Sequence, residues 1–179
     1  MTDMRMRPDS SSDYPGRTYR FYKGDKVFEF GDGLSYSKYS YEFTCVSQNN
    51  LYLNHSSSVH TTVTSDSIRY KLVSELGAEV CDKRKFTVYV GVKNHGDLAG
   101  KHPVLLFKRH ENHGDGRPNK QLIGFQSVIL SAGEMAEIQF EVSPCEHLSR
   151  ANEYGLMVME EGRHFLVVGD DKHPITIII

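Results

Sequence analysis

The sequence shows no marked excess of either charge and no long apolar segment. Lysine and arginine together number 21 against 23 aspartates and glutamates among 179 residues, a formal net charge of −2. A general nucleic-acid binder carries a strongly basic surface, so this balance excludes that class. No segment approaches the roughly 18 consecutive apolar residues of a transmembrane helix, and residues 1–8 lack the apolar region of a secretory signal. We therefore expect no nucleic acid and no membrane among its partners, and no signal peptide within the chain.

Cysteine is scarce, and its three occurrences lie far apart. Cys45, Cys81 and Cys145 form no C-x-x-C pair, so a structural zinc site is not expected. The odd number leaves two arrangements open, which are three reduced thiols or one disulfide with one remaining thiol.

Several catalytic motifs are also missing. There is no G-x-S-x-G nucleophile elbow, and the Gly31-x-Gly33 turn is too short for a phosphate-binding loop. His110, His113 and Asp115 carry metal-binding groups, but no helix sets their spacing, and a solvated loop is the favoured interpretation. We expect no metal and no cofactor.

What the sequence does have is a concentration of aromatic residues near its start. Ten of its nineteen tyrosines and phenylalanines lie between Tyr14 and Phe43. Glycines at 16, 24, 31 and 33 interrupt this stretch and indicate tight turns. So short a segment cannot bury so many rings in a core of its own. We interpret residues 1–43 as an aromatic arm that packs on a neighbouring surface.

The second half of the chain shows the alternation of β-strands. Phe86, Val88, Val90 and Val92 are separated by one residue each, and residues 136–142 repeat the pattern. About seven short strands at intervals of about 8–12 residues are typical of an immunoglobulin-like sandwich, and no βαβ alternation is present. The predicted class is mainly β: an immunoglobulin or fibronectin type III-like β-sandwich with an N-terminal aromatic-rich arm.

Two runs in the chain resemble a known family. YPGRTYRFY at residues 14–22 and VFEFGDGLSYS at 27–37 resemble a run near the end of plant β-xylosidases of glycoside hydrolase family 3. VGVKNHGDLAG at 90–100 and HFLVVG at 164–169 are similar to the fibronectin type III-like domain that closes those enzymes. The resemblance extends over nearly the whole chain.

This resemblance implies how the chain is organised. Residues 1–43 are expected to end the second catalytic domain, 44–85 to form a polar linker or insert, and 86–179 to form the fibronectin type III-like sandwich. The catalytic carboxylates of the family lie in earlier domains, so no catalytic residue is expected here. The adjacent Glu160 and Glu161 are interpreted as surface residues that point to opposite faces of a strand.

The resemblance also implies a setting and partners. The parent enzyme would be a β-xylosidase or α-L-arabinofuranosidase that acts on xylan or arabinoxylan in the extracellular plant cell wall by a retaining two-carboxylate mechanism. The expected partners are its catalytic domains and xylan or arabinoxylan oligosaccharides. The leading hypothesis is a structural role within that glycosidase. The alternative is a stand-alone carbohydrate-binding or protein-interaction module.

Individual residues can be named as candidates for packing or sugar contact, for a disulfide and for glycosylation. Aromatic faces stack on sugars or on a neighbouring domain, and interdomain packing is the favoured role. The candidates for either role are Arg17, Tyr19, Phe21, Phe30 and Tyr36. Cys81 precedes one strand and Cys145 follows another, so a disulfide between them is feasible in a secreted enzyme if those strand ends are neighbours. Asn54 begins an N-x-S sequon and is the candidate for glycosylation.

Overall fold

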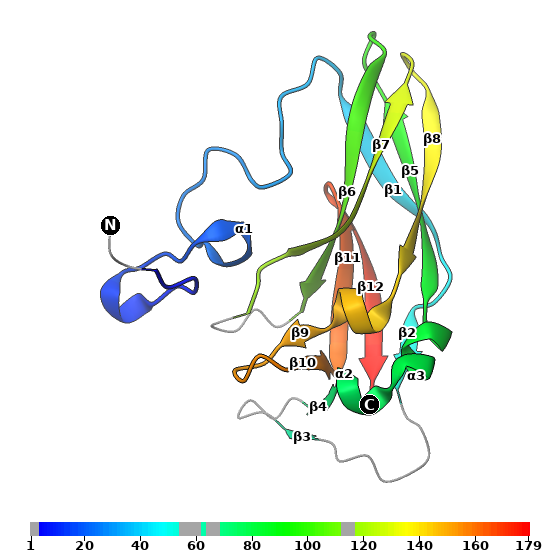
Figure 1. The fold of residues 1–179 in the computed structure, drawn as a ribbon. Coiled ribbons are helices and arrows are strands. Elements are labelled where there is room, and N and C mark those ends of the chain that lie inside the picture. Colours follow the sequence, from blue (N-terminus) through cyan, green and yellow to red (C-terminus); the bar gives the residue numbers. More distant parts are fainter. Residues whose placement is uncertain (1–3, 54–61, 64–68, 112–116) are drawn as a thin grey trace.

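A computed structural model describes residues 4–53, 62–63, 69–111 and 117–179. Most elements of this part are β-strands, and they form a sandwich of two sheets with an extended N-terminal segment at one side (Figure 1). The mainly β class predicted from the alternating pattern is therefore confirmed.

One layer of the sandwich is a three-stranded antiparallel sheet. Its strands, in spatial order, are β1 (Tyr39–Val46), β5 (Phe86–Asn94) and β8 (Met135–Val142). On β5, Phe86, Val88 and Val90 are buried because every second side chain faces the opposing layer. The alternating apolar positions of the sequence therefore form the inner face of this sheet.

The opposing layer has five strands. In spatial order they are β2 (Asn50–Tyr52), β12 (Asp171–Ile178), β11 (Gly162–Val168), β6 (Gly100–His110) and β7 (Gln121–Leu130). The β2–β12 pair is parallel and the other pairs are antiparallel. Leu106, Leu166 and Ile175 point inward and are fully buried, so the core lies between the two layers.

A smaller sheet and three short helices gather at the end of the sandwich where the chain terminates (Figure 1). The sheet orders β3 (Thr62–Val63), β4 (Arg69–Leu72), β10 (Met157–Glu160) and β9 (Arg150–Ala151). The helices are α2 (Val73–Leu76), α3 (Ala78–Lys83) and η2 (Pro144–Leu148), of which η2 is a single π-helical turn.

The N-terminal limit of the sandwich differs from the expected limit at residue 86. The strand β1 begins at Tyr39, and both β1 and β2 pair with strands of the two main layers. Tyr39, Tyr41 and Phe43 pack against the core, which explains why this polar stretch is part of the sandwich. The described residues that precede β1, 4–38, lie outside it and are here called the outer arm.

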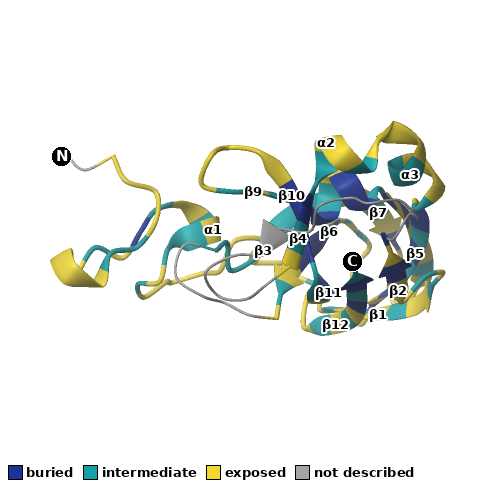
Figure 2. Ribbon diagram, turned by 90° about the horizontal axis from the view of Figure 1, so that it is seen from below, coloured by how far each residue is buried: buried dark blue, intermediate teal, exposed yellow. Residues whose placement is uncertain are grey.

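The outer arm contains little regular structure. It holds a 3₁₀ turn η1 (Ser10–Ser12) and a one-turn helix α1 (Thr18–Phe21). Figure 2 shows that buried residues are concentrated in the sandwich, whereas the outer arm extends away from it and is mostly exposed. Gly16 is its one buried residue. The backbone φ of Gly16 is 85°, and its Cα lies so near the Phe21 carbonyl oxygen that an added Cβ would clash at 2.8 Å.

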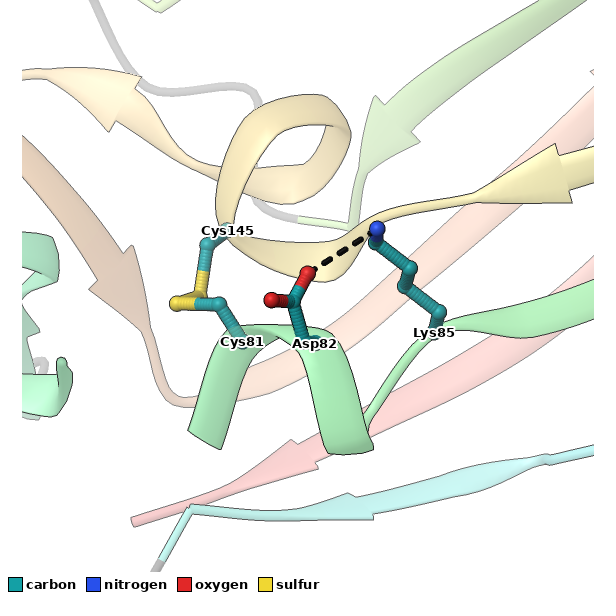
Figure 3. The surroundings of a disulfide bond; sticks show 4 residues. All are labelled: Cys81, Asp82, Lys85 and Cys145. Atoms are coloured by element: carbon teal, nitrogen blue, oxygen red, sulfur yellow. Dashed lines mark ion pairs between the residues drawn. A yellow bond between two sulfur atoms is a disulfide. The ribbon is translucent and has the colours of Figure 1, made fainter. Parts of the chain in front are cut away.

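A disulfide joins Cys81 of α3 to Cys145 of η2, with a Cα–Cα distance of 5.6 Å (Figure 3). It fastens the segment between β4 and β5 to the turn that follows β8. The Asp82–Lys85 ion pair, at 2.9 Å, lies beside it (Figure 3). Cys45 is an exposed free thiol on β1.

Candidate functional site

Three aromatic rings attach the outer arm to the sandwich. Tyr19 stacks on Phe30 with a centroid distance of 4.0 Å, and both rings meet Phe107 of β6 edge to face, at 6.5 and 6.1 Å. Phe107 points away from the sandwich core, since its neighbour Leu106 points into it, yet only 5% of its surface is exposed. The arm therefore covers the Phe107 ring, which would be exposed to solvent on the sandwich alone.

Polar contacts strengthen this attachment at the start of β7. The Asn119 N–H donates to the Arg20 carbonyl at 2.7 Å, and the Leu122 N–H donates to the Tyr19 hydroxyl at 3.1 Å. The Lys120 ammonium donates to the Phe30 carbonyl at 3.0 Å and lies 4.8 Å from the centre of the Phe107 ring. The arm and the five-stranded sheet are thus joined at a defined place.

Beyond Phe30 the arm leaves a cleft of about 530 Å³ against the outer face of the sheet. Tyr41, Leu105 and Phe107 contribute apolar and aromatic walls, and Lys101 and Asp170 contribute charge. Tyr41 hydrogen-bonds to His102, whose ring stacks on Tyr39 at 3.7 Å. Burial lowers the pKa of His102 and raises that of Tyr41. Mixed walls of this kind suit a polypeptide segment or a sugar ring.

Other apolar side chains of the outer arm face solvent. Tyr36 is 98% exposed and Leu34 is 91% exposed, and Val27 and Phe28 are exposed as well. So many uncovered apolar residues on one short segment indicate an interaction surface.

The structure separates the residues expected to act together. Tyr19 and Phe30 are in contact, whereas Tyr36 lies apart from them in solvent. Arg17 donates from Nε to the Tyr14 hydroxyl at 2.8 Å, inside the arm. The Phe21 ring is half-buried, with the Arg7 guanidinium 5.9 Å from its centre. Asn54, His113 and Asp115 lie outside the described residues.

A buried charge cluster was not predicted from the sequence. Glu160 is only 3% exposed, and its Oε1 accepts hydrogen bonds from Arg150 and, at 3.1 Å, from Arg117. The expectation that this glutamate lies on the surface is wrong. Strand periodicity gives no signal for this position, since Val158, Met159 and Glu160 are all buried and both faces of β10 are therefore covered.

The electrostatics of this cluster do not suit acid catalysis. Burial raises the pKa of Glu160, but the Arg150 and Arg117 guanidiniums outweigh it, so the net pKa is lowered. A glycosidase acid needs a raised pKa to keep its proton near neutral pH. The neighbouring Glu161 is held by Arg69, with N–O distances of 2.5 and 2.7 Å. Glu160 and Glu161 therefore act as ion-pair partners.

Two further titratable groups are buried next to the cluster. Burial is the main cause that lowers the pKa of Lys108 to about 8, and its ammonium donates to the Ser149 carbonyl. Burial also lowers the pKa of His164 to about 3, so this imidazole is neutral at pH 7. His164 contacts the His110 ring edge to face at 4.6 Å and donates from Nε2 to the Glu160 carbonyl at 3.3 Å.

The described residues form neither a metal-ligand cluster nor a helix that could span a membrane. No three histidine, cysteine, aspartate or glutamate side chains gather there in a way that could hold a metal ion. Within that same part of the chain, no helix has the length and apolar character needed to cross a membrane.

Comparisons with known proteins found a matching domain family and similar sequences in longer glycosidases. Residues 102–172 match the fibronectin type III-like domain family, Fn3-like. The chain is 60% identical to probable β-D-xylosidase 7 of Arabidopsis thaliana, over 99% of the chain and 23% of that protein. It is 37% identical to β-xylosidase/α-L-arabinofuranosidase 2 of Medicago sativa subsp. varia, over 100% of the chain and 22% of that protein.

A solved structure shares the fold. This is the structure of a glycoside hydrolase family 3 exo-β-xylosidase in complex with a xylobiose aziridine probe. The two folds superpose with a TM-score of 0.68 at 23% sequence identity, and the match covers 99% of the chain and 22% of that protein. The chain thus spans less than a quarter of the relatives that it matches. The comparisons confirm its resemblance to the C-terminal part of plant family 3 β-xylosidases, including their fibronectin type III-like domain.

Proposed function

We propose, from the premise that this chain is part of a family 3 glycosidase of the β-xylosidase type, that it braces the catalytic domains of that enzyme. The outer arm and the cleft beneath it would form the contact surface. The observation that carries the proposal is the division of the arm: Tyr19 and Phe30 fasten it to the sandwich, while the side chains of Leu34 and Tyr36 are exposed to solvent.

The chemistry of the whole enzyme would then depend on residues outside this chain. A retaining glycosidase places two carboxyl groups across the scissile bond, one as nucleophile and one as acid. In this proposal other domains supply both, and the enzyme releases pentoses from xylan or arabinoxylan in the extracellular plant cell wall. The role of this chain is structural.

Apolar burial supplies the driving force for such a contact. Covering exposed apolar surface contributes about 25 cal/mol per Å², and interfaces between domains of one chain bury about 600–1,500 Å². Val27, Leu34 and Tyr36 expose nearly their entire side chains and are the natural centre of that interface.

Self-association of the chain tests the proposal. Without a covering domain, the exposed arm should promote association, so the 179-residue chain should show concentration-dependent oligomers in sedimentation velocity. The double variant Leu34→Ser/Tyr36→Ser should be monomeric. Ile129→Ser is the matched control, because Ile129 is an exposed apolar residue on β7 outside the arm. A wild-type chain that stays monomeric at high concentration contradicts the proposal.

The cleft beside Phe30 favours one alternative, a carbohydrate-binding module. Calorimetric titration with xylotriose separates the two functions. The structural role predicts no heat at millimolar sugar. Binding that is lost in Tyr41→Ala, a residue that lines the cleft, would instead assign sugar recognition to the chain.

A further inference from the structure

The loop between β9 and β10 carries three exposed apolar side chains. Tyr154 is 78% exposed, Leu156 is 50% exposed and Met157 is 43% exposed. The rest of β10, residues 158–160, is buried. We call residues 152–157 the hairpin tip. Apolar side chains therefore gather on the tip, although the strand that follows belongs to the interior.

Hydrogen bonds within the hairpin tip hold it in one conformation. The Oδ1 of Asn152 accepts from the backbone N–H groups of Tyr154, at 3.0 Å, and of Leu156, at 2.9 Å. The Asn152 N–H donates to the Leu156 carbonyl at 2.9 Å, and Gly155 turns the chain with a φ of 78°. Asparagine side chains that bind nearby backbone groups in this way are typical of tight turns. The tip is thus preorganised, so a partner that binds it orders little additional chain.

The base of the hairpin is fixed to the sandwich. Arg150 of β9 pairs with Val158 of β10 in the ladder, and its guanidinium donates to the buried Glu160. Both strands of the hairpin are therefore tied down where the tip begins, and the exposed side chains have a defined position.

The hairpin tip lies on the same side of the sandwich as the outer arm. Figure 1 and Figure 2 both show the β9–β10 loop and the arm projecting from that side. Phe21 of the arm and Met157 of the tip line one hollow of about 220 Å³. The tip therefore borders the surface that the proposed function assigns to the catalytic domains.

The size of the tip indicates what kind of partner it fits. Three side chains expose too little surface for a stable dimer, which buries about 1,200–2,000 Å². A contact within one polypeptide needs less area, because the two surfaces are already joined and meet at a high effective concentration. The chain spans 23% of its Arabidopsis relative, so most of that protein lies outside it. A body of that size seated on the arm would also reach the neighbouring tip.

We propose that the hairpin tip inserts Tyr154 and Leu156 into an apolar recess of a catalytic domain in the same polypeptide. This inference rests on the proposed function and adds a second contact, which comes from the sandwich itself. Preorganised aromatic and aliphatic side chains that enter a recess are the usual anchors of an interface. Two separate contacts fix the orientation of the sandwich, since one contact alone leaves it free to rotate.

Hydroxyl-radical footprinting of a chimera tests this contact. In the chimera, this chain replaces the matched segment of the 60% identical Arabidopsis relative. Oxidation of Tyr154 and Met157 should be roughly tenfold slower in the chimera than in the dilute 179-residue chain, because both side chains become buried in an interface. Met135, which is 50% exposed on β8, is the matched control and should be oxidised equally in both proteins. Unchanged oxidation of Tyr154 and Met157 would overturn the proposal.

The same experiment separates the tip from the arm. Protection of Tyr36 without protection of Tyr154 and Met157 would refute the tip contact and leave the bracing role of the arm intact. Protection of the two tip residues without that of Tyr36 would support the tip contact and contradict the role of the arm. Loss of Tyr154 oxidation in the 179-residue chain as its concentration rises would assign the tip to a second copy and refute the proposal.

A double variant connects the contact to stability. Tyr154→Ser/Leu156→Ser should lower the melting temperature of the chimera by several degrees. It should leave that of the 179-residue chain unchanged, because both side chains are already exposed there. Leu98→Ser, at an exposed leucine between β5 and β6, is the matched control and should change neither temperature. Equal losses in the chimera and in the chain alone would show that the tip only stabilises the sandwich, which would refute the contact.

Discussion

The sandwich and the outer arm are both rich in apolar residues, but they use them differently. In the sandwich, Val88, Val90, Leu106 and Ile175 are fully buried between two sheets. In the outer arm, Gly16 is the one buried residue, and Val27, Leu34 and Tyr36 lie in solvent. Similar side chains thus form a core in one region and a surface in the other.

The difference shows what each region depends on. In the sandwich, strand pairing satisfies the hydrogen-bonding groups of the backbone and determines which side chains face the core. The sandwich is therefore stabilised by contacts among its own residues. The outer arm has one isolated bridge, between Asp9 and Tyr14, and two helical pieces of three and four residues. Its order depends on side-chain contacts with another surface, and we expect it to open at lower free energy than the sandwich.

The largest expected effect follows from removing the disulfide between Cys81 and Cys145. The bond joins cysteines 64 residues apart, and the chain-entropy model gives about 4 kcal/mol for a loop of that length. The double variant Cys81→Ala/Cys145→Ala should lower the free energy of unfolding by that amount in urea titration. Cys45→Ala, at the exposed free thiol, is the control and should change it little. A loss below about 1 kcal/mol in the double variant would argue against the model.

Acid should weaken the sandwich through its buried histidine. The pKa of His164 is lowered from 6.5 to about 3, so below pH 6.5 the unfolded chain takes up a proton that the folded chain does not. The free energy of unfolding should therefore fall by about 2 kcal/mol from pH 6.5 to pH 4.5. The lowered pKa of Glu160 adds to the loss at lower pH. His164→Leu should flatten this pH profile, and His95→Gln, at an exposed turn, should leave it steep.

A buried asparagine tests how one side chain holds the end of the sandwich. Asn94 is fully buried, and its Nδ2 donates to the carbonyls of Leu98 at 2.8 Å and Ser131 at 3.0 Å. Its Oδ1 accepts from the Gly96 N–H at 2.9 Å. Asn94→Ala should cost about 2 kcal/mol in thermal unfolding, since these groups lose their partners. Asp97→Ala, exposed in the same turn, should have an effect near zero, and equal effects would contradict this role.

The smallest expected effect concerns the attachment of the outer arm to the sandwich. Tyr19→Ala removes the ring that stacks on Phe30 and should weaken attachment of the arm by about 1 kcal/mol. Trypsin should then cleave at Lys23 and Lys26 several-fold faster, while the urea midpoint of the sandwich stays nearly constant. Tyr36→Ala, at a fully exposed ring, is the control. Equal cleavage rates for the two variants would show that Tyr19 does not hold the arm.

Much of the sandwich could be predicted because alternation is a local property. Residues 86–92 and 136–142 show period two in the sequence, and β5 and β8 occupy those positions. The inclusion of β1 and β2 could not be predicted in the same way. Their stretch is polar and irregular, and its pairing partners, β5 and β12, lie far along the chain.

The sequence by itself determined the β class, the resemblance to family 3 glycosidases and the aromatic character of the arm, because composition, periodicity and motifs are readable along the chain. The tertiary structure alone decided which charges and rings meet. Arg20 and Arg150 line one pocket although 130 positions separate them, and Phe107 is covered by rings from the arm. Burial and electrostatic contact depend on distance in space, which no local pattern encodes.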